Sequence, residues 1–185
     1  VGLAKYSNAP IPAMVQQEFA NETINGSVPF YYADSEADRT RAENEIKINP
    51  YPITKKALEH GKLLYDIYCG ICHGEKADGS GYLVRDDGKY PAQPAILTSD
   101  EFTAASNGRF YFAIMHGKNV MGSSADKLSY EERWQVIHYI RALQAQNKGL
   151  QYDENGNTLN KTDFIASTNK GVVAKNVSDS TSVAN

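Results

Sequence analysis

The sequence has few cysteines, no long apolar run and little net charge, and each shortage excludes a class of protein. Its longest apolar run, Phe110 to Met115, is far shorter than the about 20 residues of a membrane-spanning helix. The 185 residues include two cysteines, too few for the disulfide framework of a small secreted domain. The formal net charge of -3 argues against nucleic acid as a partner, because phosphates are bound by an excess of Lys and Arg.

Composition divides the chain into three parts. Residues 1–53 hold seven acidic and four basic residues, five of the seven prolines and six aromatic residues. Proline-rich extended chain with aromatic anchors predicts an arm that docks onto a neighbouring subunit, with a disordered tether as the alternative. Within this arm, the charged stretch 34–45 predicts a solvated helix. Residues 148–185 predict a polar extension with little to bury.

The middle part, residues 54–147, carries eleven charged residues of each sign and the helical periodicity of the chain. The expected helices run from Thr54 to Cys69, from Asp100 or Asn107 to His116, and from Ser129 to near Gly149. Ser129 and Glu132 have the spacing of a capping box, and Gly117 stops the second helix. The fold class is therefore expected to be all-α, with long irregular N- and C-terminal extensions.

The two cysteines stand three positions apart and are followed directly by a histidine, in the order Cys69-Gly-Ile-Cys72-His73. This spacing is typical of c-type haem attachment. Two thiols on one turn of helix can each bond a vinyl group of a single porphyrin, and the adjacent imidazole then lies below the iron as its proximal ligand. The motif therefore predicts one covalent haem c, with His73 as a metal ligand.

Two other readings of the cysteine pair remain open. A redox dithiol has the same Cys-x-x-Cys spacing, but it normally lies in a βαβ unit, and no strand pattern surrounds this pair. A zinc site normally needs a second pair of ligands with similar spacing, and the chain has no further cysteines. Haem attachment is the preferred reading.

Around this motif, the middle part resembles a class I cytochrome c. Members of that family have a glycine and an aromatic residue four positions apart before the haem motif, as Gly61 and Tyr65 are here. Their last helix crosses the first at that glycine and brings aromatic and apolar side chains to the crossing, where Trp134, Tyr139 and Ile140 fit. The resemblance implies helices packed around one covalently bound haem. A missing side chain at Gly61 would let two helix backbones approach closely.

The second axial ligand has several candidates. They are Met14, Met115, Met121, His60, His116 and His138. Met121 is preferred because it lies in a loop between two glycines, 48 residues after His73. His116 is the main rival, and an open iron site is a further alternative. The resemblance also favours Met121, although Gly122 stands where the family commonly has a proline.

Other residues are expected to line the haem site. Leu97 is a candidate for its apolar wall, and Arg109, Tyr90 and Trp134 are candidate donors to the propionates. The family orients its proximal histidine with a proline carbonyl, for which Pro91 and Pro94 are the candidates.

Iron ligated by His73 and Met121 predicts an electron carrier rather than an enzyme, because both axial positions are filled. The layout and the stretch 108–143 resemble the mono-haem cytochrome c subunit of bacterial alternative complex III, a quinol oxidoreductase. That resemblance implies a multi-haem cytochrome c as donor and a terminal oxidase or soluble cytochrome as acceptor. It also implies a lipidated N-terminal cysteine as membrane anchor, whereas the first cysteine here is Cys69. Because haem is attached covalently outside the cytoplasmic membrane, the protein is expected on the periplasmic side of that membrane. The alternatives are an open-haem enzyme or gas sensor, a free periplasmic carrier and a structural subunit.

Overall fold

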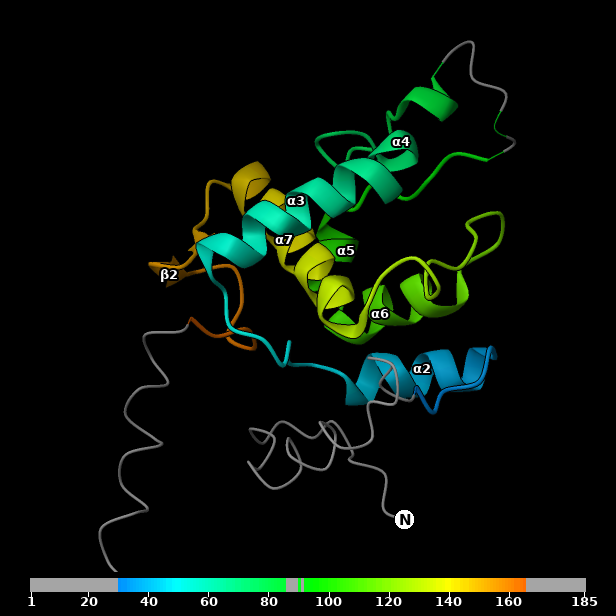
Figure 1. The fold of residues 1–185 in the computed structure, drawn as a ribbon, viewed down its shortest axis with the longest axis horizontal. Helices are drawn as coiled ribbons and strands as arrows, with labels where there is room; N and C mark the ends of the chain where they lie inside the picture. Colours follow the sequence, from blue (N-terminus) through cyan, green and yellow to red (C-terminus); the bar gives the residue numbers. More distant parts are fainter. Residues whose placement is uncertain (1–29, 86–89, 91, 166–185) are drawn as a thin grey trace, which may run out of the picture.

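The computed structural model describes residues 30–85, 90 and 92–165, and these residues are mostly helical (Figure 1). The helices are α2 (Glu36–Glu45), α3 (Lys55–Tyr68), α4 (Gly70–His73), α5 (Asp100–Ala104), α6 (Asn107–His116) and α7 (Tyr130–Lys148), with a 3-10 helix η2 (Tyr82–Val84). Two short antiparallel strands, β1 (Tyr152–Asp153) and β2 (Gly156–Asn157), follow α7. No helix in these ranges combines the length and the apolar character needed to span a bilayer. The all-α expectation is confirmed for the middle part of the chain.

The helix boundaries follow local signals in the sequence. The Thr54 side chain accepts a hydrogen bond from the Ala57 amide and caps α3, as predicted. Of the two expected starts of the second helix, Asn107 is confirmed, because α6 runs from Asn107 to His116. The residues from Asp100 form the separate helix α5, and Ala105 and Ser106 lie between the two in extended conformations. Gly117 ends α6, and Gly149 ends α7 in the left-handed conformation that glycine adopts without strain.

Helix α3 crosses α7 at Gly61, as the resemblance implied (Figure 1). A Cβ atom added to Gly61 would lie 2.1 Å from the carbonyl oxygen of Gln135 on α7. Beside this crossing, the rings of Tyr65 and Tyr139 meet edge to face, with centroids 5.4 Å apart. The backbones therefore touch at the one position that has no side chain.

Residues 30–53, the described part of the first extension, pack on the chain's own helices. The docking of residues 1–53 onto a neighbouring subunit stays a prediction. Helix α2 forms where a solvated helix was predicted, but Ala42 on it is completely buried. The Gly108 amide on α6 donates to the Ile46 carbonyl at 2.8 Å, and a Cβ atom on Gly108 would meet the Ala42 carbonyl. Charge patterning did not predict the contact between α2 and α6, because most positions of α2 are polar. The part of the arm before residue 30 lies outside the described residues.

The segment after α7 is also packed, although little burial was expected for it. Tyr152 and Asp163 are 4% and 5% exposed. Ile53, just before α3, forms a parallel bridge with Ile165 and donates its amide to the Phe164 carbonyl at 2.7 Å. Segments from both extensions thus meet beside α7 and belong to the same folded unit as residues 54–147. Residues 166–185 lie outside the described residues.

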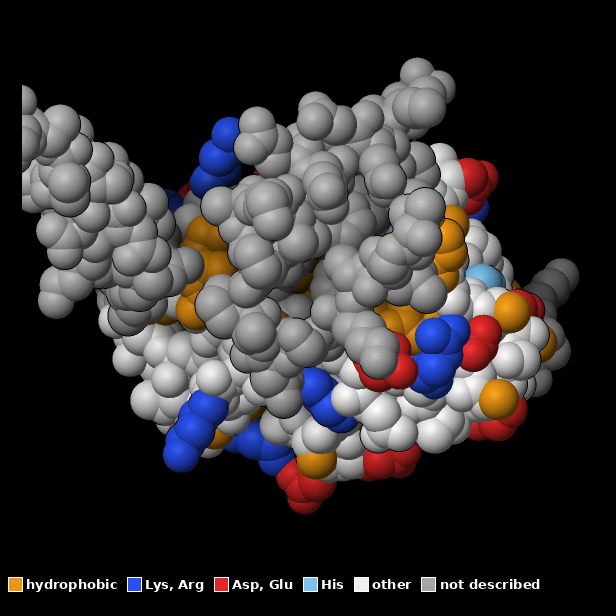
Figure 2. Space-filling view, turned by 90° about the horizontal axis from the view of Figure 1, so that it is seen from below, with side chains coloured by type: hydrophobic (Ala, Val, Ile, Leu, Met, Phe, Trp, Pro, Cys, Tyr) orange, Lys and Arg blue, Asp and Glu red, His pale blue; other side chains and the backbone are white. Residues whose placement is uncertain are grey.

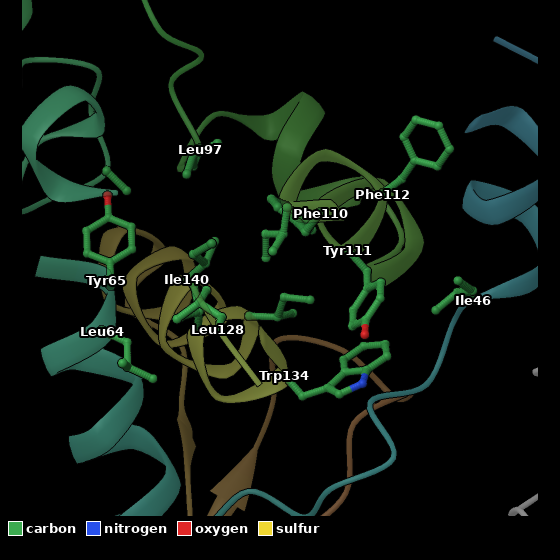
Figure 3. Close-up of a cluster of buried hydrophobic side chains, with 14 of the residues drawn as sticks. Ile46, Leu64, Tyr65, Leu97, Phe110, Tyr111, Phe112, Leu128, Trp134 and Ile140 are labelled. Atoms are coloured by element: carbon green, nitrogen blue, oxygen red, sulfur yellow. The ribbon is translucent and has the colours of Figure 1, made fainter. Parts of the chain in front are cut away.

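The main apolar core lies between α3, α6 and α7 (Figure 3). Tyr65 and Leu64 enter it from α3, Phe110 and Tyr111 from α6, and Trp134, Ile137 and Ile140 from α7. In Figure 3, Leu97 and Tyr65 lie on one side of this cluster, Phe112 and Ile46 lie on the other, and Trp134 lies beside Tyr111 between them.

Replacing Ser129 with alanine is expected to lower the free energy of unfolding by about 1 kcal/mol. The Ser129 hydroxyl accepts from the Glu132 amide, and the Glu132 carboxylate accepts from the Ser129 amide at 2.7 Å. The alanine variant loses the side-chain half of this box. Chemical denaturation measures the change, and Ser129→Thr, which keeps an acceptor, is the matched control. Equal stability of all three chains would contradict the prediction.

Candidate haem site

The Cys-x-x-Cys-His motif lies on the short helix α4, directly after α3. Cys69 lies between the end of α3 and the start of α4, so both thiols and the imidazole come from about one turn of helix. The His73 amide donates to the Cys69 carbonyl at 2.9 Å. The Tyr65 hydroxyl donates to the Gly74 carbonyl at 2.8 Å, which ties the end of α4 to the core side of α3. The motif is therefore held at both ends.

The two thiols are free and have an environment that suppresses ionisation. Burial raises the pKa of Cys69 to about 12, with Cys72 adding to the shift, and burial also raises the pKa of Cys72. Redox-active dithiols normally have a lowered pKa, because the thiolate is the reactive form. This environment therefore argues against the redox dithiol reading. Within the described ranges, no three His, Cys, Asp or Glu side chains gather in a group that could hold a metal ion by themselves.

The ring of His73 is oriented by the carbonyl of Ala95. Nδ1 lies 3.0 Å from this oxygen, and because a carbonyl only accepts, Nδ1 carries the proton and leaves Nε2 as the nitrogen able to bind a metal. Burial lowers the pKa of His73, which favours the neutral imidazole that a metal requires. The expected acceptor was Pro91 or Pro94. The structure gives the residue after Pro94 instead, and Pro91 lies outside the described residues. Every residue has a backbone carbonyl, so the sequence alone cannot identify the one that accepts from His73.

The loop after α4 folds back onto the motif. The Gly81 amide donates to the Cys72 carbonyl at 3.0 Å, and a Cβ atom on Gly81 would lie 2.4 Å from the same carbonyl. Further along, the Leu97 amide donates to the Ala77 carbonyl at 2.9 Å. Gly81 is thus needed for a close approach that the sequence analysis did not single out.

Met121 lies in a tight turn after α6. Its amide and carbonyl both hydrogen-bond to Lys118, at 2.9 and 3.0 Å, and Asn119 within the turn has a positive φ of 54°. The Tyr90 hydroxyl donates to the Val120 carbonyl at 2.7 Å, so the loop that carries Ala95 also contacts the methionine turn. These bonds hold the turn although Gly122 replaces the usual proline.

The rival ligands have other partners. His116 Nε2 lies 2.8 Å from the Tyr32 carbonyl, His60 Nδ1 lies 2.6 Å from the Gln135 side chain, and His138 is completely buried between Tyr152 and the Tyr51 carbonyl. Met115 packs against the apolar core. Met14 lies outside the described residues. Of the described candidates, Met121 is thus the one that lies in a loop. Its side chain is not part of the core cluster.

The remaining candidates fall in different places. Leu97 is buried and faces the end of the core cluster that also contains Tyr65 (Figure 3). Arg109 forms an ion pair with Glu101 at 2.6 Å, and its Cζ lies 4.3 Å from the centroid of the Phe102 ring. Its charge is therefore already paired with a carboxylate of the chain. Trp134 has a buried indole N–H with no acceptor among the described residues, and its ring packs against Tyr111, with centroids 4.5 Å apart.

The residues present fit a covalently attached haem. Three exposed apolar side chains stand next to the residues that would hold it: Ile71 between the cysteines, Ile96 after Ala95 and Val120 before Met121, at 44%, 50% and 47% exposure. Exposed apolar side chains beside the residues that would hold a haem fit a surface that an apolar ligand covers. Two free thiols, one neutral imidazole and one thioether supply the bonds.

Residues 56–140 match the family model described as "Cytochrome C oxidase, cbb3-type, subunit III". No curated protein matches the chain. The matched range begins in the first turn of α3 and ends in α7, so it contains the haem motif, the methionine turn and the crossing at Gly61. The match supports a class I c-type cytochrome domain, which implies covalently bound haem c and electron transfer.

Proposed function

We propose that this chain carries single electrons as a mono-haem c-type cytochrome with His73 and Met121 as axial ligands. The observation that carries the proposal is the motif geometry, in which one free thiol directly precedes α4, the other lies on it, and the His73 ring is oriented by the Ala95 carbonyl. When bound, the haem supplies a one-electron couple. Cys69 and Cys72 attach it, and the apolar residues around the site exclude water, which keeps the cost of solvent reorganisation low.

Replacing either Cys69 or Cys72 with alanine is expected to weaken or abolish covalent haem attachment, because each thiol makes one of the two bonds. Haem staining of the denatured chain measures the change, with the unaltered chain as the positive control. The double variant should carry no covalent haem. Retention of haem by the double variant under denaturing conditions would contradict the proposal.

The carrier function itself is tested by a redox titration. The proposal expects a single one-electron transition and a ferric sulfur-to-iron charge-transfer band in the visible spectrum. Rapid binding of carbon monoxide to the resting reduced protein would instead favour the open-site enzyme or gas sensor.

We further propose that the chain is a subunit of a membrane-associated respiratory complex on the periplasmic side of a bacterial membrane, between quinol oxidation and a terminal oxidase. The matched model describes a subunit of a cytochrome c oxidase, and the resemblance noted above points to a quinol oxidoreductase. Residues 54–147 carry eleven charged residues of each sign, and among the charged side chains coloured in Figure 2 both signs are interspersed. Such a surface gives weak electrostatic steering, which suits a fixed partner better than a diffusing one.

Purification from native membranes distinguishes the possible partners. Co-elution with a multi-haem cytochrome c and quinol-oxidising activity supports the alternative complex III assignment. Co-elution with an oxidase alone supports an oxidase subunit, and recovery as a free soluble protein supports a periplasmic carrier.

A further inference from the structure

A chain of hydrogen-bonded polar side chains runs through the interior beside α7. Its members, named here the polar chain, are Asn107, Arg141, Gln144, Tyr152 and Asp163. All five are at least nine-tenths buried. Burying a guanidinium and a carboxylate is costly unless every group is hydrogen-bonded. Such a network is therefore expected to hold its neighbours in one arrangement.

One end of the polar chain holds the segment after α7. Arg141 Nε donates to Asn107 Oδ1 at 3.0 Å, and Asn107 Nδ2 donates to Asp163 Oδ1 at 2.7 Å. The Tyr152 hydroxyl donates to the other oxygen of Asp163 at 2.8 Å. Asn107 thus joins the buried cation and the buried anion, which come from different parts of the chain.

The other end of the polar chain reaches the backbone beside the haem motif. Arg141 Nη1 donates to Gln144 Oε1 at 2.9 Å, and Gln144 Nε2 donates to the Leu97 carbonyl at 2.7 Å. The Leu97 amide is bonded on its other side to Ala77 at 2.9 Å. Leu97 is therefore held from α7 and from the loop after α4 at the same time.

Leu97 stands two residues after Ala95, whose carbonyl orients His73. The described contacts thus form a continuous path from Asp163, through Arg141 and Gln144, to the backbone segment 95–97 and the histidine. Arg141 also donates to the Ala105 carbonyl at 2.6 Å. This bond holds the end of the segment that connects Leu97 to α6.

We propose that Gln144, fixed by Arg141, is a positioning residue for the proximal ligand: it holds segment 95–97 so that the Ala95 carbonyl accepts from His73 Nδ1. This inference rests on the proposed function, in which His73 binds the iron. A histidine that donates a firm hydrogen bond is a more basic ligand, and a more basic ligand stabilises the ferric state. Loosening Ala95 therefore raises the reduction potential.

The test compares two variants of the full chain with haem attached. Gln144→Met keeps the side chain's length but removes its hydrogen bonds with Arg141 and with the Leu97 and Phe102 carbonyls. Gln135→Met is the matched control, because Gln135 is a buried glutamine on the same helix whose side chain bonds to Glu131 and His60 instead. Gln144→Met is expected to raise the potential and to move the His73 Nδ1–H proton resonance of the reduced protein upfield. Gln135→Met is expected to change neither.

Asp163→Asn provides a second variant that keeps the size of the side chain, and it should shift both readouts in the same direction by a smaller amount. An unchanged potential and resonance in the haem-bearing variants would overturn the inference, as would an equal shift in Gln135→Met. Absence of covalent haem from the unaltered chain would contradict the proposed function and the inference with it, so the two failures are distinguishable.

Discussion

Replacing Met121 with alanine is expected to lower the reduction potential and to open the iron to external ligands. The thioether favours ferrous iron, so its loss should cost a sizeable part of the about 0.8 V range that axial ligands span. The turn that presents Met121 is closed by its two bonds with Lys118 and by the Tyr90 contact, so the backbone is expected to survive the change. Potentiometric titration and carbon monoxide binding measure the two effects.

Met115→Leu is the matched control for this experiment. Met115 precedes His116 on α6 and packs against the core cluster, where leucine has nearly the same volume. The control should keep the potential and exclude carbon monoxide. An unchanged potential in Met121→Ala would assign the sixth ligand elsewhere, first of all to His116, whose bond to the Tyr32 carbonyl would then have to break.

Replacing Gly61 with alanine is expected to destabilise the protein by about 3 kcal/mol or more. The new Cβ atom would stand 2.1 Å from the carbonyl oxygen and 2.7 Å from the carbonyl carbon of Gln135, and neither backbone atom can move without shifting α7. Helices α3 and α7 would have to separate, and α3 leads directly into the haem motif. Thermal or chemical denaturation of the full chain measures the loss.

Gly122→Ala is the control for the crossing, because a Cβ atom there meets nothing within 4 Å and the stability should stay within about 0.5 kcal/mol. Gly108→Ala extends the same test to α2, since its Cβ atom would lie 2.0 Å from the Ala42 carbonyl. Full stability of the Gly61 variant would mean that the helices cross less closely than the structure shows.

Much of the local structure could be predicted because its causes lie close together in the sequence. Thr54 caps the helix that begins one residue later, and Ser129 and Glu132 close a capping box within a single turn. The crossing at Gly61, which the resemblance to class I cytochromes c implied, is confirmed, because the missing side chain lets the two backbones meet. The extensions were the main difference. Charge patterning identified the helix at α2, but the burial of Ala42 depends on Gly108, which is far away in the chain.

The sequence by itself was enough to predict the attachment chemistry, because two thiols and an imidazole need only one turn of backbone to face the same porphyrin. The tertiary structure decided which groups support them. Ala95 accepts from His73 through its backbone carbonyl, a group that every residue has. Arg109 forms an ion pair with Glu101 instead of being available to a haem propionate. Asp163 reaches the polar chain from beyond the last helix. Such contacts join residues that are distant in sequence and meet only in the folded chain. Residue spacing therefore cannot predict them.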